Sequence, residues 1–159
     1  MTVTGETGTG AGRGDWRIVP LGPATQHLLD RIEAEVFDGP IRPEARAAFL
    51  SDPRHLMVLA EAGGRVVGMA SATELLHPDK RPQLFINEVG VAPGWQRKGI
   101  GRALVSSLVA EARARGCDYA WLGTSTDNLG GNACFASVPG ATKGETFVLY
   151  EWALSPRVR

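Results

Sequence analysis

The chain has 159 residues, 43% apolar and 21% charged, a composition typical of one soluble globular domain with a sizeable core. Its 17 basic and 17 acidic residues cancel, which argues against a nucleic-acid-binding protein, because such a protein would show a basic excess. No apolar run is long enough to cross a bilayer and no signal-peptide core is present, so we expect a cytoplasmic protein with no membrane partner.

The first 14 residues are rich in glycine and threonine, which predicts a disordered tail before one folded domain over 15–159. Within that domain, hydrophobic spacing and glycine or proline breaks predict the secondary structure. In chain order we expect a strand over 16–21, helices over 24–36 and 43–50, strands over 55–61, 65–76 and 84–91, a helix over 100–115, a strand over 118–123, a helix over 127–137 and a strand over 146–154. This order indicates a mixed α/β sheet with an antiparallel front half and a parallel centre.

The stretch Gln96-Arg97-Lys98-Gly99-Ile100-Gly101 stands between a predicted buried strand and a predicted helix. Amides of such a loop and of the first helical turn have no backbone partner, and the helix dipole adds positive potential, so the stretch predicts an anion site. It is not a P-loop, and Leu104 stands where a dinucleotide fingerprint needs its third glycine. Cys117 and Cys134 lack metal-ligand spacing and are interpreted as buried thiols, so we expect no metal.

Gln-x-x-Gly-x-Gly after a buried strand resembles the start of the pyrophosphate loop of the Gcn5-related N-acetyltransferases (GNAT). The likeness continues through the strand 87–91, Pro93, the helix, the strand 118–123 and the Asp127-Asn128 pair, and it covers residues 16–154. The resemblance implies a single GNAT-like α/β domain with splayed parallel central strands and helices on both faces. It also implies acetyl-CoA as cosubstrate.

By this resemblance, loop amides hold the pyrophosphate of acetyl-CoA. The pantetheine arm lies like an extra strand beside 84–91, and the amide of Val89 polarises the thioester oxygen. The cofactor-binding residues implied are Val89, Val91, Gln96, Arg97, Lys98, Gly99, Ile100, Gly101, Arg102 and Asn128.

Glu88 is the candidate general base, because it lies on the strand that would carry the thioester end of the cofactor. The sequence departs from the family at Phe135, which stands where a tyrosine often protonates the leaving thiolate. Phenylalanine has no proton to donate. The thiolate would therefore be protonated by water or by another group, or would leave unprotonated.

Short segments around 36–40, 52–55, 68–72, 77–80 and 86–91 are similar to the small aminoglycoside acetyltransferases that modify the 3-amino group. We therefore expect a polycationic small-molecule amine, bound by Glu33, Asp38, Glu88 and Asp127. Two alternatives remain: a GNAT enzyme acting on a polyamine, an amino acid or a protein N-terminus, and a non-catalytic acyl-CoA-binding module. A homodimer is common in the family.

Overall fold

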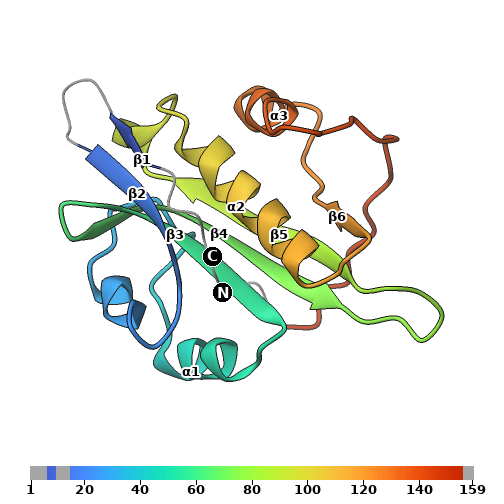
Figure 1. Cartoon of the computed structure of the whole chain (residues 1–159), viewed down its shortest axis with the longest axis horizontal. Helices are drawn as coiled ribbons and strands as arrows, with labels where there is room; N and C mark the ends of the chain where they lie inside the picture. The colour runs from blue at the N-terminus through green and yellow to red at the C-terminus, as the bar shows by residue number, and fades with distance from the viewer. Residues whose placement is uncertain (1–6, 10–14, 156–159) are drawn as a thin grey trace.

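The computed structural model describes residues 7–9 and 15–155 (Figure 1). Its strands are β1 (Thr7–Thr9), β2 (Asp15–Pro20), β3 (His55–Ala62), β4 (Arg65–Leu75), β5 (Gln83–Val91) and β6 (Tyr119–Trp121). Its helices are α1 (Pro43–Ser51), α2 (Ile100–Ala114) and α3 (Leu129–Ala136), with 3-10 helices η1 (Gln26–Asp30) and η2 (Pro93–Trp95). The tail expected over 1–14 lies outside the described residues except for β1, which pairs with β2 and so belongs to the sheet.

The strands form one mixed sheet in the order β1-β2-β3-β4-β5-β6. Neighbours from β1 to β5 run antiparallel, whereas β5 and β6 run parallel. The α/β class and the antiparallel front half are therefore confirmed. The parallel pair lies at one edge of the described sheet, because the chain after α3 adds no strand beyond β6.

Helix α2 covers one face of the sheet, across β3, β4 and β5 (Figure 1). Its inward stripe includes Ile100, Leu104 and Leu108, which have almost no exposed surface, and burying each such side chain contributes about 1.5–3 kcal/mol. Gly68 on β4 permits the close approach, because a Cβ there would lie 3.0 Å from Ile100 Cγ2. The start of α2, which carries the glycine motif, is therefore held directly on the sheet.

The opposite face is covered by η1, the segment 31–42 and α1, so helices lie on both faces as predicted. Gly90 on β5 lets the segment approach, because a Cβ on Gly90 would overlap the carbonyl oxygen of Val36. Val36 is itself buried. The main chain of this segment therefore lies directly against β5, close to the candidate base.

The helix predicted over 24–36 is reduced in the structure to the 3-10 helix η1 at Gln26–Asp30. The backbone of the next residues pairs with β4 instead: Val66 donates to the carbonyl of Arg31, and Glu33 donates to the carbonyl of Val66, both at 2.8 Å. Glu35 then takes a left-handed φ of 63°, which ends any helical continuation. Apolar spacing alone could not reveal this competing pairing.

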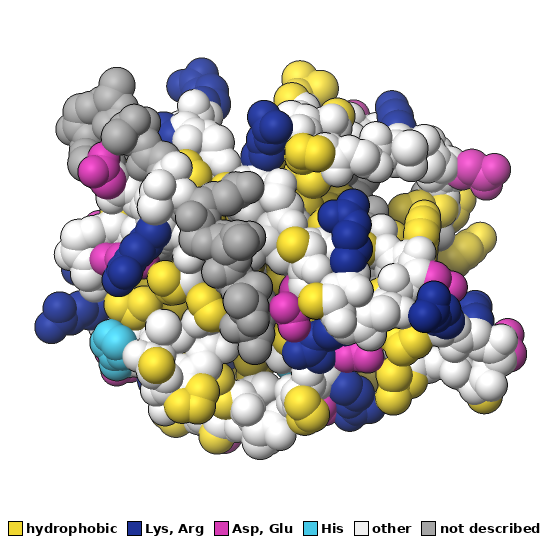
Figure 2. Space-filling view, in the orientation of Figure 1, with side chains coloured by type: hydrophobic (Ala, Val, Ile, Leu, Met, Phe, Trp, Pro, Cys, Tyr) yellow, Lys and Arg dark blue, Asp and Glu magenta, His cyan; other side chains and the backbone are white. Residues whose placement is uncertain are grey.

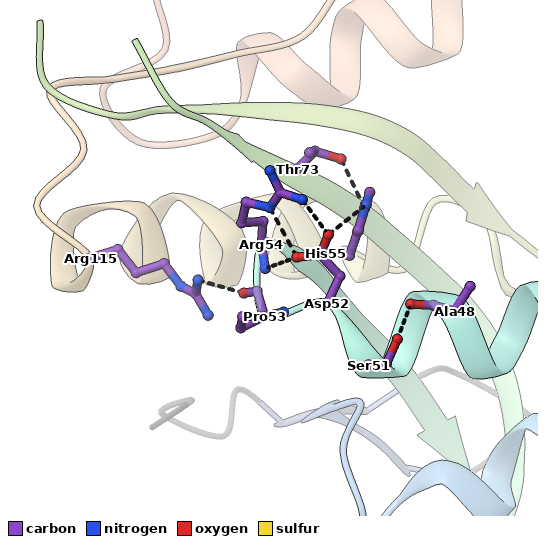
Figure 3. Close-up of polar contacts among 8 residues, drawn as sticks. All are labelled: Ala48, Ser51, Asp52, Pro53, Arg54, His55, Thr73 and Arg115. Carbon is purple, nitrogen blue, oxygen red and sulfur yellow. Dashed lines mark hydrogen bonds and ion pairs between the residues drawn. The ribbon is translucent and has the colours of Figure 1, made fainter. Parts of the chain in front are cut away.

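An ion-pair network fixes the turn between α1 and β3 (Figure 3). The Asp52 carboxylate accepts bonds from the guanidinium and the backbone amide of Arg54, and these hold the pKa of Asp52 well below its usual range. Arg115, just after α2, donates to the carbonyl of Pro53 and to Glu74, each at 2.9 Å. Arg115 thus joins the end of α2 to the turn before β3 and to β4.

The strand predicted over 146–154 does not form, and residues 141–154 have no regular structure. The segment passes beside Gly123, where a Cβ would lie 2.8 Å from the Phe147 ring, but no ladder joins it to β6. Figure 2 shows hydrophobic side chains at the right-hand margin, where this segment runs in Figure 1. Its exposed apolar residues are Phe147, Val148, Leu149, Tyr150, Trp152 and Leu154.

Candidate active site

The loop between β5 and α2 has a defined geometry. Trp95, buried in η2, anchors its first half, and the side-chain amide of Gln96 donates to the carbonyl of Val91 at 3.1 Å. Arg97 and Gly99 both adopt left-handed backbone, with φ of 58° and 81°. A non-glycine residue in that region is strained, and such strain concentrates at ligand-binding turns. Gln96 therefore closes the loop, and Gly99 supplies the turn into α2.

The first turn of α2 offers backbone donors. The first helical bond runs from the amide of Ala103 to the carbonyl of Gly99 at 3.0 Å, so the amides of 100–102 have no acceptor within the helix. Nothing lies within 4 Å of the position that a Cβ on Gly99 would take, so the loop is open there. These donors, with the helix dipole and the exposed Arg97 and Arg102 side chains, fit a phosphate group.

The gap between β5 and β6 lies beside this turn. Ala92 donates to the carbonyl of Val67 on β4, and alternate residues of a strand point their polar groups to opposite sides. Val89 and Val91 therefore direct their backbone groups away from β4. On that side β6 pairs with 83–85 alone, so within the described residues no strand faces the rest of β5. An extended ligand arm could add there as a strand.

Glu88 faces the other surface of the sheet. It is the cross-strand neighbour of Ser71 on β4, and its exposed side chain lines a cavity of about 300 Å³ beneath α1. The walls of this cavity are mostly apolar. They comprise Leu21, Leu29, Phe37, Asp38, Gly39, Pro40, Ile41, Arg42, Ala45, Arg46, Phe49, Leu50, Met57 and Glu88. Adjacent residues of β5 thus present a carboxylate to the cavity and the Val89 amide to the cofactor gap.

The four expected acceptor-binding acids are not assembled in one place. Asp38 lines the same cavity as Glu88. Glu33 instead pairs with Arg65 at 2.8 Å, near the start of β4. Asp127 is exposed beside α3 and does not line that cavity. The acidic cluster expected from the sequence is therefore reduced to two carboxylates.

Three residues in and next to α3 have structural roles. The side-chain oxygen of Asn128 caps α3 by accepting from the amide of Gly131 at 3.0 Å, and its nitrogen donates to Thr124. Phe135 is half-buried and packs on the core, so it has a packing role where the family often has a proton donor. Cys134 packs against the first turn of α2, and burial raises the pKa of its thiol, which opposes a nucleophilic role.

Sequence reasoning missed the apolar wall of the cavity, including Phe37, Phe49 and Met57. Their spacing in the sequence is the same as that of ordinary core residues. Only the tertiary structure shows that they line one cavity with Glu88. Within residues 7–9 and 15–155, no set of three or more His, Cys, Asp or Glu side chains is arranged to hold a metal. None of the helices in these residues has the length and apolarity needed to cross a membrane.

A sheet that opens beside a glycine-containing helix N-terminus is the arrangement expected of an acyltransferase that binds an acyl-CoA. A family model described as "Acetyltransferase (GNAT) family" matches residues 24–138. The chain therefore belongs to the GNAT acetyltransferase family and is an acetyl-CoA-dependent N-acetyltransferase.

Similar proteins agree with this family. The N-alpha-acetyltransferase RimI of Mycobacterium tuberculosis (strain ATCC 25618 / H37Rv) is 33% identical over 131 residues, 78% of this chain and 79% of its own. An aminoglycoside acetyltransferase from an uncultured soil metagenomic sample, solved with trehalose, superimposes with a TM-score of 0.74 at 19% identity, covering 88% of this chain and 97% of its own. AAC(6')-Iy, solved with the bisubstrate analogue CoA-S-monomethyl-acetylneamine, gives 0.70 at 18% identity over 87% and 98%. At these identities the two structural likenesses show the fold alone.

Proposed function

We propose that this enzyme acetylates a primary amine by direct attack on the thioester, with Glu88 as the general base. The observation that carries this proposal is the position of Glu88. Its carboxylate lines the cavity opposite α2, on the same strand whose end leads into the 96–101 loop. A base so placed takes the proton of the attacking amine, a contribution of about 10²–10⁴-fold to the rate.

The donor end of the site is formed by the loop and the gap. The amides of 97–102 and the charges of Arg97 and Lys98 hold the pyrophosphate, and the turned-out backbone of Val89 and Val91 holds the pantetheine arm. The Val89 amide donates to the thioester oxygen, where negative charge develops. Asn128 contributes by fixing the start of α3 beside the arm. The CoA thiolate leaves without a proton from a side chain at position 135, because Phe135 has no proton to donate.

The acceptor favoured by the cavity is the N-terminal amine of a peptide whose first side chain is apolar. Phe37, Phe49 and Met57 offer an apolar group a place beside Glu88, and Asp38 and Glu88 suit one ammonium group. The relative named N-alpha-acetyltransferase supports the same acceptor class.

An aminoglycoside is the second candidate. It is favoured by the shared cavity of Asp38 and Glu88 and by the names of the structural neighbours. Against it, a polycation would meet Arg42 and Arg46 on the same cavity wall, while Glu33 lies elsewhere in an ion pair. The neighbour named by position is a 6'-enzyme, so acetylation of a 3-amino group stays a hypothesis that a gentamicin assay tests directly.

The test is an acceptor screen that measures CoA thiol release from acetyl-CoA. Its arms are hexapeptides with apolar, acidic or basic first residues, the same peptides already N-acetylated, a polyamine and gentamicin. We expect release with apolar free N-termini and none with the blocked peptides. Release with gentamicin alone would make the aminoglycoside the acceptor, and acetyl-CoA binding without release on any arm would contradict the proposed activity.

The role of Glu88 is tested by Glu88→Gln, with the exposed Glu145→Gln as matched control. We expect Glu88→Gln to lower kcat at neutral pH by about 10²–10⁴-fold, with the Kd for acetyl-CoA unchanged because the donor site is left intact. An unaltered kcat would remove Glu88 from the mechanism.

A further inference from the structure

Helix α1 packs less closely on the sheet than α2 does. Seven residues of α2 are buried, whereas none of α1 is, although α1 carries Phe49 and Leu50. Two cavities lie beside α1, although Phe49 packs on the core: the one beside Glu88, of about 300 Å³, and a second, of about 590 Å³. The second cavity lies against η1 and is lined by Gln26, Leu29, Asp30, Ile32, Ile41, Pro43, Arg46, Ala47 and Leu50.

The two cavities adjoin each other along α1. They share the lining residues Leu29, Ile41, Arg46 and Leu50. Arg46 crosses between them, and its guanidinium donates to Asp30 at 2.8 Å and to the carbonyl of Gln26 at 2.7 Å. Its side chain is 23% exposed, so the guanidinium lies in the wall and not out in solvent. Arg46 thus forms part of the wall between the second cavity and the one that Glu88 lines.

Charged side chains are distributed unequally between the two cavities. Asp38 and Glu88 line the first cavity alone and suit an ammonium group, and apolar side chains, Arg42 and Arg46 complete its wall. Arg46 also lines the second cavity, together with its partner Asp30. This distribution suits the N-terminal stretch of a peptide, which has an ammonium, an apolar side chain, and then carbonyl or carboxylate oxygens that an arginine binds. A polycation has no oxygen anion to offer Arg46.

We propose that the second cavity is a subsite for the acceptor peptide beyond its first residue, and that Arg46 determines specificity there by binding a carbonyl or carboxylate of that peptide. This inference rests on the proposed peptide acceptor. At about 3.3–3.6 Å per extended residue, the second and third residues are the ones that reach past the first cavity. Arg46 acts on binding of the peptide and not on the amine that reacts, so its effect falls on KM.

The experiment compares a dipeptide amide with a hexapeptide that has the same first two residues and an acidic third residue. The measured quantity is the ratio of kcat/KM for the hexapeptide to that for the dipeptide. Ala47→Met fills the second cavity, and Ala48→Met is its matched control, because Ala48 is also an exposed alanine on α1 but lines neither cavity. Arg46→Ala removes the guanidinium, and Arg46→Lys retains the charge without the fork.

We expect the wild-type ratio to exceed ten, and Ala47→Met and Arg46→Ala each to lower it by about tenfold through KM, the loss of one charge-assisted contact. Arg46→Lys should recover part of it, and Ala48→Met should leave it unchanged. A wild-type ratio near one, or a ratio unaltered by Ala47→Met, overturns the subsite and leaves the proposed function standing. Failure of the wild-type enzyme to acetylate either peptide overturns both.

Discussion

Gly90 is the position where one added methyl group tests the architecture of the acceptor side. In Gly90→Ala the new Cβ would overlap the carbonyl oxygen of Val36 and lie 3.2 Å from its carbonyl carbon. Carbon atoms pack at about 3.5–4.0 Å, so the segment over β5 must move by roughly 1 Å. The obstacle is main chain, and no side-chain rotation can relieve it.

The expected cost is that of overpacking, about 1–3 kcal/mol of unfolding free energy. For a chain of this size each kcal/mol lowers Tm by about 2–4 °C. The displaced segment carries Phe37 and Asp38, which line the cavity beside Glu88. We therefore expect the acceptor KM to rise as well. The Kd for acetyl-CoA should stay within about twofold, because the donor loop is held by Gln96 and α2.

The measurements are urea unfolding, acceptor KM and acetyl-CoA binding by calorimetry. The matched control is Gly22→Ala, where nothing lies within 4 Å of the new Cβ and φ is not positive. If Gly90→Ala proves as stable as Gly22→Ala, the segment does not lie against β5 as described. If its stability falls but the acceptor KM does not change, the segment has no part in acceptor binding.

Three further outcomes are expected. Burial tends to raise the pKa of Glu61, but the bonds from Arg17 and a backbone amide outweigh it and lower that pKa. At pH 7 the protein with Glu61 should therefore be more stable than Glu61→Gln by about 1 kcal/mol of unfolding free energy. Urea unfolding repeated at lower pH should show this difference disappearing below the usual carboxyl pKa. A difference that persists at pH 2 would contradict this. Gly101→Ala should lower Tm, because its Cβ would lie 2.8 Å from Cys134 Sγ, and Cys134→Ala should relieve that loss in the double variant; additive losses would count against the contact. Burial raises the thiol pKa of Cys117 and Cys134, so at pH 7.5 both should alkylate more slowly than glutathione in a timed iodoacetamide assay, and faster labelling of either would refute that environment.

Local signals determined much of the fold and the donor site. Alternating apolar residues and glycine turns were enough to predict β2 to β5 within about a residue or two, and the spacing from Ile100 onward predicted α2. The Gln-x-x-Gly-x-Gly stretch also predicted the loop that leads into α2, whereas the left-handed φ of Gly99 that makes the turn is seen in the structure. These strands, this helix and this loop depend on residues that are close together in the chain, so the sequence is enough to predict them.

The tertiary structure decided which of the acids expected at the acceptor side share one cavity. Asp38, Met57 and Glu88 come from three separate segments, and they share a cavity only because Gly90 admits the main chain of Val36. Glu33 looked equivalent to Asp38 in the sequence, but its neighbourhood pairs with Val66 on β4, and its carboxylate is held by Arg65. The failure of 146–154 to form a strand has the same physical reason. A strand needs a partner as well as a pattern, and the availability of a partner is a property of the packed molecule.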